Sequence, residues 1–96
     1  MLYLVAEIKA YPDCVEQVQN LLTGLLEPTR RESGCCQYEL YQDEKIPGLF
    51  MFQESWASQE ALDKHLSSSH IQAFNRQLSD NDWVEYTQLR PLKFVG

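Results

Sequence analysis

Apolar and polar residues alternate along the first ten positions of the chain. The even-numbered residues from Leu2 to Ala10 are all apolar, and the intervening positions include Glu7 and Lys9. A period of two is typical of a strand with one buried face. Pro12 and Asp13 end this pattern, and Asp13 is a suitable N-cap for a helix that follows.

The spacing changes to three and four residues over the next segment. Its apolar positions are Val15, Val18, Leu22, Leu25 and Leu26. This spacing predicts an amphipathic helix with one stripe to bury. Pro28 lacks a backbone donor, so we expect it to kink or interrupt the helix near its last turns. Gly34 is a plausible C-terminal cap.

Two further segments alternate and are separated by a short turn. Residues 35–42 place Cys36, Tyr38 and Leu40 on one face, and residues 49–56 form the second segment. The loop DEKIPG between them contains Pro47-Gly48, so the two strands are expected to form a hairpin. One face of the second strand carries Phe50, Phe52, Glu54 and Trp56.

The remainder reads as two short helices and a last strand. Ser58 is a candidate N-cap for a helix with the stripe Ala61, Leu62, His65 and Leu66. Ser67-Ser68-Ser69 interrupts it, and a second helix carries Ile71, Phe74 and Leu78. Residues 83–95 are extended, and Pro91 restricts that strand to a sheet edge or a bulge.

The order strand, helix, strand, strand, helix pair, strand predicts one α+β domain over residues 1–96. It is the ferredoxin-like βαββαβ arrangement, a four-stranded antiparallel sheet with its helices on one face. The other face carries Tyr3 and Val5, so part of it is apolar. We therefore expect a homodimer in which two sheets pack face to face.

Charge and composition exclude several classes of partner. The net charge is −6, and no basic stripe is present to neutralise phosphates. Nucleic acids and anionic membranes are therefore not expected partners. No apolar run approaches the roughly 20 residues of a membrane span. The N-terminus has no basic region before Glu7, so we expect no signal peptide and a cytoplasmic location.

The chain resembles the antibiotic biosynthesis monooxygenase domain family, a group of small dimeric α+β barrels. The resemblance rests on residues 28–41 (PTRRESGCCQYELY), on Glu54-Ser55-Trp56, and on the helix pair with His65, His70 and Phe74. It runs nearly end to end. In some members it implies oxidation of phenols or hydroquinones by O₂ without a cofactor, whereas other members isomerise a phosphorylated sugar signal or degrade haem.

His65 is the best candidate catalytic base. It lies on the apolar side of its predicted helix, and a near-neutral imidazole could take a phenolic proton. The phenolate formed is electron-rich enough to reduce O₂ without flavin or metal. Glu54 shares a strand face with aromatic residues, where burial would raise its pKa. It could orient His65 or bind substrate, and each residue could equally be a hydrogen-bonded part of the core.

An aromatic set could line the substrate pocket or form plain core. The predicted substrate-binding residues are Trp56, His70, Phe50, Phe52, Tyr38 and Phe74. His65 and His70 are five residues apart, which is not a same-face helical spacing, and only Glu54 offered a nearby third ligand. The spacing therefore predicts no metal site, and the resemblance to the family implies oxidation without a cofactor. The roles of Cys14, Cys35, Cys36 and Arg90 stay open.

The predicted function is a cofactor-independent monooxygenase that acts on a hydroquinone or polyphenol, with His65 as the base. Two alternatives remain at this stage. One is an isomerase of a small sugar-phosphate-like signal that uses His65 and His70 as acid and base. The other is a non-catalytic module that binds a small ligand or serves in stress responses.

Overall fold

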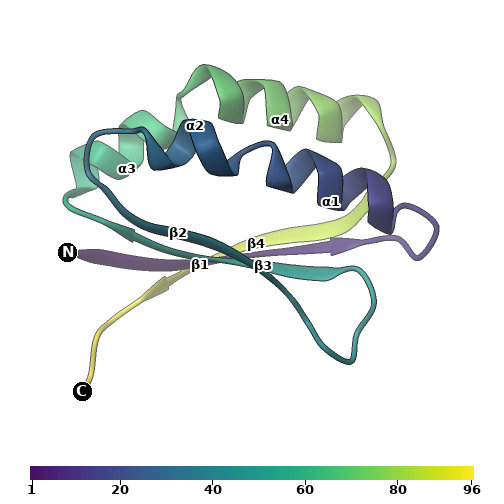
Figure 1. Cartoon of the computed structure of the whole chain (residues 1–96), viewed down its shortest axis with the longest axis horizontal. Helices are drawn as coiled ribbons and strands as arrows, with labels where there is room; N and C mark the ends of the chain where they lie inside the picture. The colour runs from purple at the N-terminus through teal and green to yellow at the C-terminus, as the bar shows by residue number, and fades with distance from the viewer.

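The computed structural model describes residues 1–96, and a four-stranded antiparallel sheet carries all the helices on one face (Figure 1). The elements in chain order are β1 (Leu2–Ala10), α1 (Val15–Thr23), α2 (Leu26–Arg30), β2 (Cys35–Gln42), β3 (Leu49–Trp56), α3 (Gln59–Leu66), α4 (Ser69–Asp80) and β4 (Val84–Leu92). The strand order is β2-β3-β1-β4. This is the predicted ferredoxin-like fold, and the edge position predicted for the strand that contains Pro91 is confirmed.

The core lies between the sheet and the helices. Alternate residues of β1 are buried from Leu4 to Ala10, as the period of two predicted. β3 pairs with β1 along its whole length, which places Phe50, Phe52 and Trp56 at the centre of the helix-facing side. The stripe of α1 buries Val18 and Leu22 against this layer.

The first helical segment is divided in two, close to the point at which Pro28 was expected to interrupt it. α1 ends at Thr23 and α2 begins at Leu26. Pro28 has no N–H to donate to the carbonyl four residues earlier, which is that of Gly24. The predicted cap at Asp13 was wrong. A turn in which Cys14 N donates to Tyr11 O (2.9 Å) places Cys14 at the N-cap position.

A bulge changes the predicted faces at the start of β2. Cys35 pairs with Trp56, but Gln37 pairs with Ser55, so Cys36 has no cross-strand partner. A bulge of this kind inserts one residue and turns it away from its expected face. Cys36 is therefore exposed, and Cys35 packs against the core in its place. The assignment of Cys36 to the face of Tyr38 was wrong.

Gly34 brings the loop before β2 close to α3. Its φ of +86° lies in the left-handed region that favours glycine. A Cβ at this position would lie 2.6 Å from the Cβ of Ala61 on α3, so a side chain has no room there. The Gly34 carbonyl also accepts from Ala57 N at 2.8 Å. As a result, loop residues 31–34 lie directly beside α3.

Serine caps define the break between α3 and α4. Ser58 Oγ accepts from Ala61 N at 3.1 Å, which confirms the predicted cap of α3. Ser68 Oγ caps α4 through Ile71 N (3.4 Å) and donates to the His65 carbonyl (2.7 Å). This hydroxyl therefore serves the end of one helix and the start of the next. His65 lies in the last turn of α3, and His70 lies in the first turn of α4.

The opposite face of the sheet is not covered by helices. By the β1–β4 register, the central part of this face consists of Tyr3, Val5, Glu7 and Lys9 with Leu92, Arg90, Gln88 and Tyr86. After β4 the chain leaves the sheet on the side away from the helices (Figure 1). No helix in the structure is long and apolar enough to cross a membrane.

Candidate functional site

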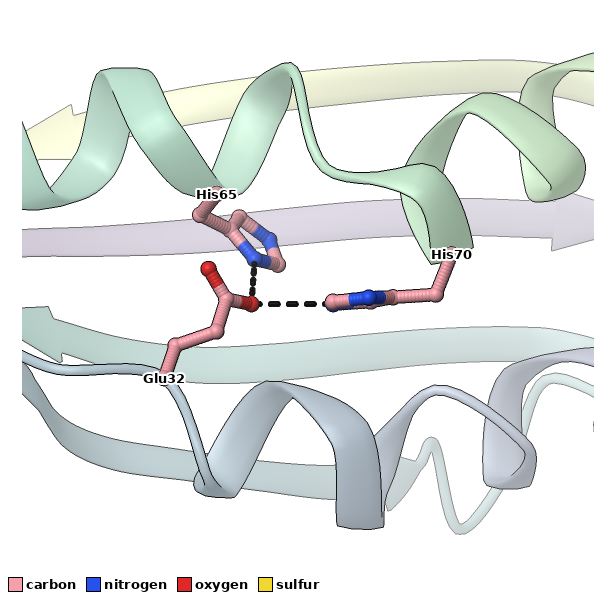
Figure 2. Close-up of side chains that lie close together, drawn as sticks. All are labelled: Glu32, His65 and His70. Atoms are coloured by element: carbon pink, nitrogen blue, oxygen red, sulfur yellow. Dashed lines mark hydrogen bonds and ion pairs between the residues drawn. The ribbon is translucent and has the colours of Figure 1, made fainter.

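One carboxylate oxygen joins both histidines of the chain. Glu32 Oε2 lies 2.7 Å from His65 Nδ1 and 2.9 Å from His70 Nε2. Figure 2 shows Glu32 extending from the loop after α2 and lying between the two imidazoles. The three side chains therefore form a bridge that connects the loop, the end of α3 and the start of α4.

The bridge selects which ring nitrogen of each histidine carries the proton when the ring is neutral. An ionised carboxylate only accepts hydrogen bonds, so the contacting nitrogens, His65 Nδ1 and His70 Nε2, carry the protons. No protein group makes a hydrogen bond with the other ring nitrogen of His65, Nε2. In the neutral ring this nitrogen has a free lone pair and can accept a proton.

The surroundings of His65 favour its neutral form. The side chain is only 3% exposed, and its ring lies 4.6 Å from the Trp56 ring and 5.5 Å from the Tyr38 ring, between centroids. Burial lowers the pKa of His65 from its usual value, although the negative charge of Glu32 offsets part of that effect. His65 is therefore neutral at neutral pH, while Glu32 is placed to stabilise an imidazolium when one forms.

Glu54 is a second titratable group in the same core. Burial raises the pKa of Glu54 to about 7, although a hydrogen bond from Trp56 Nε1 (3.0 Å) partly offsets this shift and the charge of Glu32 adds to it. Only Oε1 of Glu54 has a protein partner. Near neutral pH, Glu54 thus exchanges between a carboxylic acid and a carboxylate.

A cavity of about 320 Å³ lies between the sheet and the helices, mostly lined by apolar side chains. His65, Glu54 and Tyr38 are among its polar lining residues. Burial, together with the charge of Glu54, raises the pKa of the Tyr38 phenol, which therefore stays neutral. Leu89 of the edge strand also lines the cavity and is 54% exposed, which places an accessible side at β4. The cavity can enclose a small, largely apolar molecule with a few polar groups.

The structure divides the predicted substrate-binding residues into two groups. Tyr38, Phe52 and Phe74 line the cavity. Phe50, Trp56 and His70 are not among the lining residues. Phe50 and Trp56 are fully buried, and Trp56 contacts the two candidate catalytic groups: it donates to Glu54 and lies against the His65 ring.

Sequence reasoning missed Glu32. The expectation that Glu54 could orient His65 was wrong in this respect, because Glu32 occupies the Nδ1 side of the ring. Glu54 was also named as the only nearby third ligand for a metal, and Glu32 supplies that third group instead. The five-residue spacing suggested that the two histidines would lie on different helix faces. They lie on two separate helices instead, because the chain breaks at Ser67 and Ser68, and both rings point toward Glu32. The only signal in the sequence was the acid two residues before Gly34.

Fold and site together define a small ferredoxin-like α+β protein with a mostly apolar cavity, and His65 and Glu54 are among the residues that line it. The model of the antibiotic biosynthesis monooxygenase family matches residues 1–77. The chain belongs to this family.

Curated relatives extend the comparison. The chain is 33% identical to "Putative monooxygenase Rv0793" of Mycobacterium tuberculosis over 91 residues, which cover 93% of this chain and 89% of that protein. It is 34% identical to "Uncharacterized protein sll1783" of Synechocystis over 77 residues. That match covers 80% of this chain but only 52% of the Synechocystis protein, so the chain spans about half of that relative's length.

Solved structures of similar proteins have the same fold. The crystal structure of PA3566 from Pseudomonas aeruginosa has a TM-score of 0.92 at 32% identity and covers 99% of this chain and 94% of that chain. A crystal structure described as an antibiotic biosynthesis monooxygenase has a TM-score of 0.89 at 29% identity, with both chains fully covered. These likenesses support a monooxygenase-like protein, and the names of the relatives give no substrate.

The raised pKa of Glu54 predicts a specific dependence of stability on pH. The folded state holds this proton more tightly than the unfolded state, so the contribution of Glu54 is fully present below pH 4.5 and is lost as pH rises through about 7. Relative to Glu54→Gln, the wild-type free energy of unfolding should fall by about 3 kcal/mol across this window. Urea denaturation of both proteins at several pH values measures it. A constant difference between the two proteins would show that Glu54 titrates normally.

Proposed function

We propose that the chain is a cofactor-independent monooxygenase that oxidises a hydroquinone or polyphenol with O₂, and that His65 is its base. The observation that carries this proposal is the free Nε2 of a buried, neutral His65 on the wall of an apolar cavity. Membership of the family and the names of its relatives support the reaction class.

The reaction begins when Nε2 of His65 takes the proton of a phenolic hydroxyl group. The phenolate transfers an electron to O₂, and the radical pair combines to form a carbon–oxygen bond. The O–O bond of the peroxide then breaks. One oxygen stays on the ring as a quinone carbonyl, and the other leaves as water with two hydrogens from the substrate. The substrate supplies all four electrons, so this step needs no external reductant.

Glu32 is proposed as the positioning residue for this base. Its carboxylate fixes the proton on Nδ1 and directs Nε2 away from the bridge. When His65 becomes an imidazolium, the adjacent negative charge stabilises it. The same charge compensates for the low intrinsic basicity that burial imposes on the ring.

Glu54 is proposed as the general acid in the later step, in which the O–O bond breaks and water leaves. With a pKa of about 7, a substantial fraction of Glu54 is protonated at neutral pH. Its second oxygen has no protein partner, and the residue lines the cavity. A proton donor at this position can stabilise negative charge on the peroxide oxygen and assist the loss of water.

We also propose that the chain is a homodimer that pairs through the open sheet face. Tyr3, Tyr86 and Leu92 are partly exposed on this face, and Phe94 in the following tail is 70% exposed and lies against Tyr3 (6.1 Å between centroids). The charges between them are already partnered within the chain. Glu7 accepts from Tyr86 Oη at 2.7 Å and lies 3.6 Å from Arg90. An apolar surface with internally paired charges suits burial against a second copy.

Removal of the base should abolish oxygen uptake. Purified, metal-stripped protein is assayed with an oxygen electrode against a panel of hydroquinones and polyphenols. His65→Ala should lower kcat by roughly 10²- to 10⁴-fold, the usual effect of losing a general base. Glu60→Gln, an exposed position on the same helix, is the matched control and should keep wild-type turnover.

Three results would contradict this proposal. The first is the absence of uptake above autoxidation with every compound. The second is wild-type turnover in a folded His65→Ala protein. The third is activity that appears only after a redox cofactor is added to the assay.

The dimer is tested by sedimentation equilibrium at micromolar concentration. We expect a species of twice the 11.2 kDa chain mass. Phe94→Asp places a charge on the proposed interface and should shift the protein toward monomer. Gln19→Asp adds the same charge on the helix layer and should leave the dimer intact. A wild-type protein that sediments only as the monomer would overturn the proposed pairing.

A further inference from the structure

We propose that Glu32, His65 and His70 form a binding site for a divalent first-row transition-metal ion such as Zn²⁺. It is the only group of three metal-ligating residues that the fold brings together. The ligand atoms are Glu32 Oε2, His65 Nδ1 and His70 Nε2, and all lie within 4.8 Å of one another.

The three ligand atoms would have to rearrange around an ion. A tetrahedral zinc ion at roughly 2.0–2.2 Å from each ligand sets neighbouring ligands about 3.3–3.6 Å apart. The two contacts of Glu32 are 2.7 and 2.9 Å, so each would lengthen by roughly half an ångström or slightly more around an ion. The two ligand nitrogens lie within 4.8 Å of each other and would have to reach the same separation. Glu32 lies in a loop and His70 in the first turn of α4.

The site is preorganised but not sealed. His65 is 3% exposed and has Trp56 against its ring, which fixes one ligand. His70 and Glu32 are 21% and 16% exposed, so an ion can enter from their side. Two imidazoles and one carboxylate leave at least one coordination position open, as in zinc sites that also hold water.

The donor types select the class of ion. Imidazole suits Zn²⁺, Cu²⁺, Ni²⁺ and Fe²⁺, whereas Mg²⁺ and Ca²⁺ prefer oxygen ligands alone. Neutral histidines bind through a lone pair, so the ion would take Nδ1 of His65 and move its proton to Nε2. A bound ion would therefore remove the proposed base, and this one consequence rests on the proposed function.

Cobalt binding tests the site without any assay of turnover. Tag-free, thiol-alkylated protein is titrated with Co²⁺, whose visible ligand-field absorption reports tetrahedral nitrogen and oxygen ligation. Calorimetry with Zn²⁺ gives the stoichiometry. We expect one ion per chain, and competition by Zn²⁺ should abolish the cobalt spectrum. Alkylation removes the three free thiols as alternative ligands.

Variants separate this site from adventitious binding. His70→Ala and Glu32→Gln should each weaken binding by more than the roughly 10- to 100-fold effect of losing an outer-shell partner. Glu44→Gln, an exposed acid outside the group, should bind like the wild type. Circular dichroism confirms that each variant is folded. Absence of a cobalt spectrum in the wild type, or unchanged affinity in either site variant, would overturn the proposal. Inactivity of the protein toward phenols would not affect this result.

Discussion

The carboxylate of Glu32 accepts hydrogen bonds from both histidines, and three segments of the chain depend on that contact. A largely buried carboxylate is costly unless hydrogen-bond donors surround it, so the loop, the last turn of α3 and the first turn of α4 must meet at one point. Gly34 lets the loop approach α3, and Ser68 interrupts the helical chain between the histidines. The charge of Glu32 also raises the pKa values of Glu54 and His65, in addition to the larger effect of burial on each.

Burial acts in opposite directions on the pKa values of Glu54 and His65, two titratable groups that line the cavity. It raises the pKa of Glu54 to about 7 and lowers the pKa of His65. Both groups therefore favour their neutral forms, one as a proton donor and the other as an acceptor. Pairs of groups with environments of this kind recur in acid–base catalysis. Trp56 connects them, because its N–H bonds Glu54 while its ring lies against His65.

Much of the fold could be predicted because it is encoded locally. The alternation in β1, the apolar face of β3, and the serine that caps α3 each depend on residues close in sequence. The exposed position of Cys36 could not be predicted in this way, because a bulge arises from the register between two strands. The prediction of Asp13 as the N-cap was wrong because the Tyr11–Cys14 turn places Cys14 at that position.

In the candidate site, too, some residues could be predicted from the local sequence and others depend on long-range contacts. His65 and Glu54 could be named because an ionisable residue on an apolar face stands out in a sequence. Glu32 could not, because its partners lie 33 and 38 residues away and its place depends on the positive φ of Gly34. In the sequence it is one of many acids in a chain of net charge −6.

The most direct measurement of the central claim is ¹⁵N NMR of the two imidazole rings in metal-free protein at neutral pH. Ring nitrogen shifts and couplings distinguish the two neutral tautomers from the cation. The arrangement around Glu32 predicts a neutral His65 with its proton on Nδ1 and an unprotonated Nε2. A proton on Nε2 of His65, or a His65 that is cationic at this pH, would contradict the account.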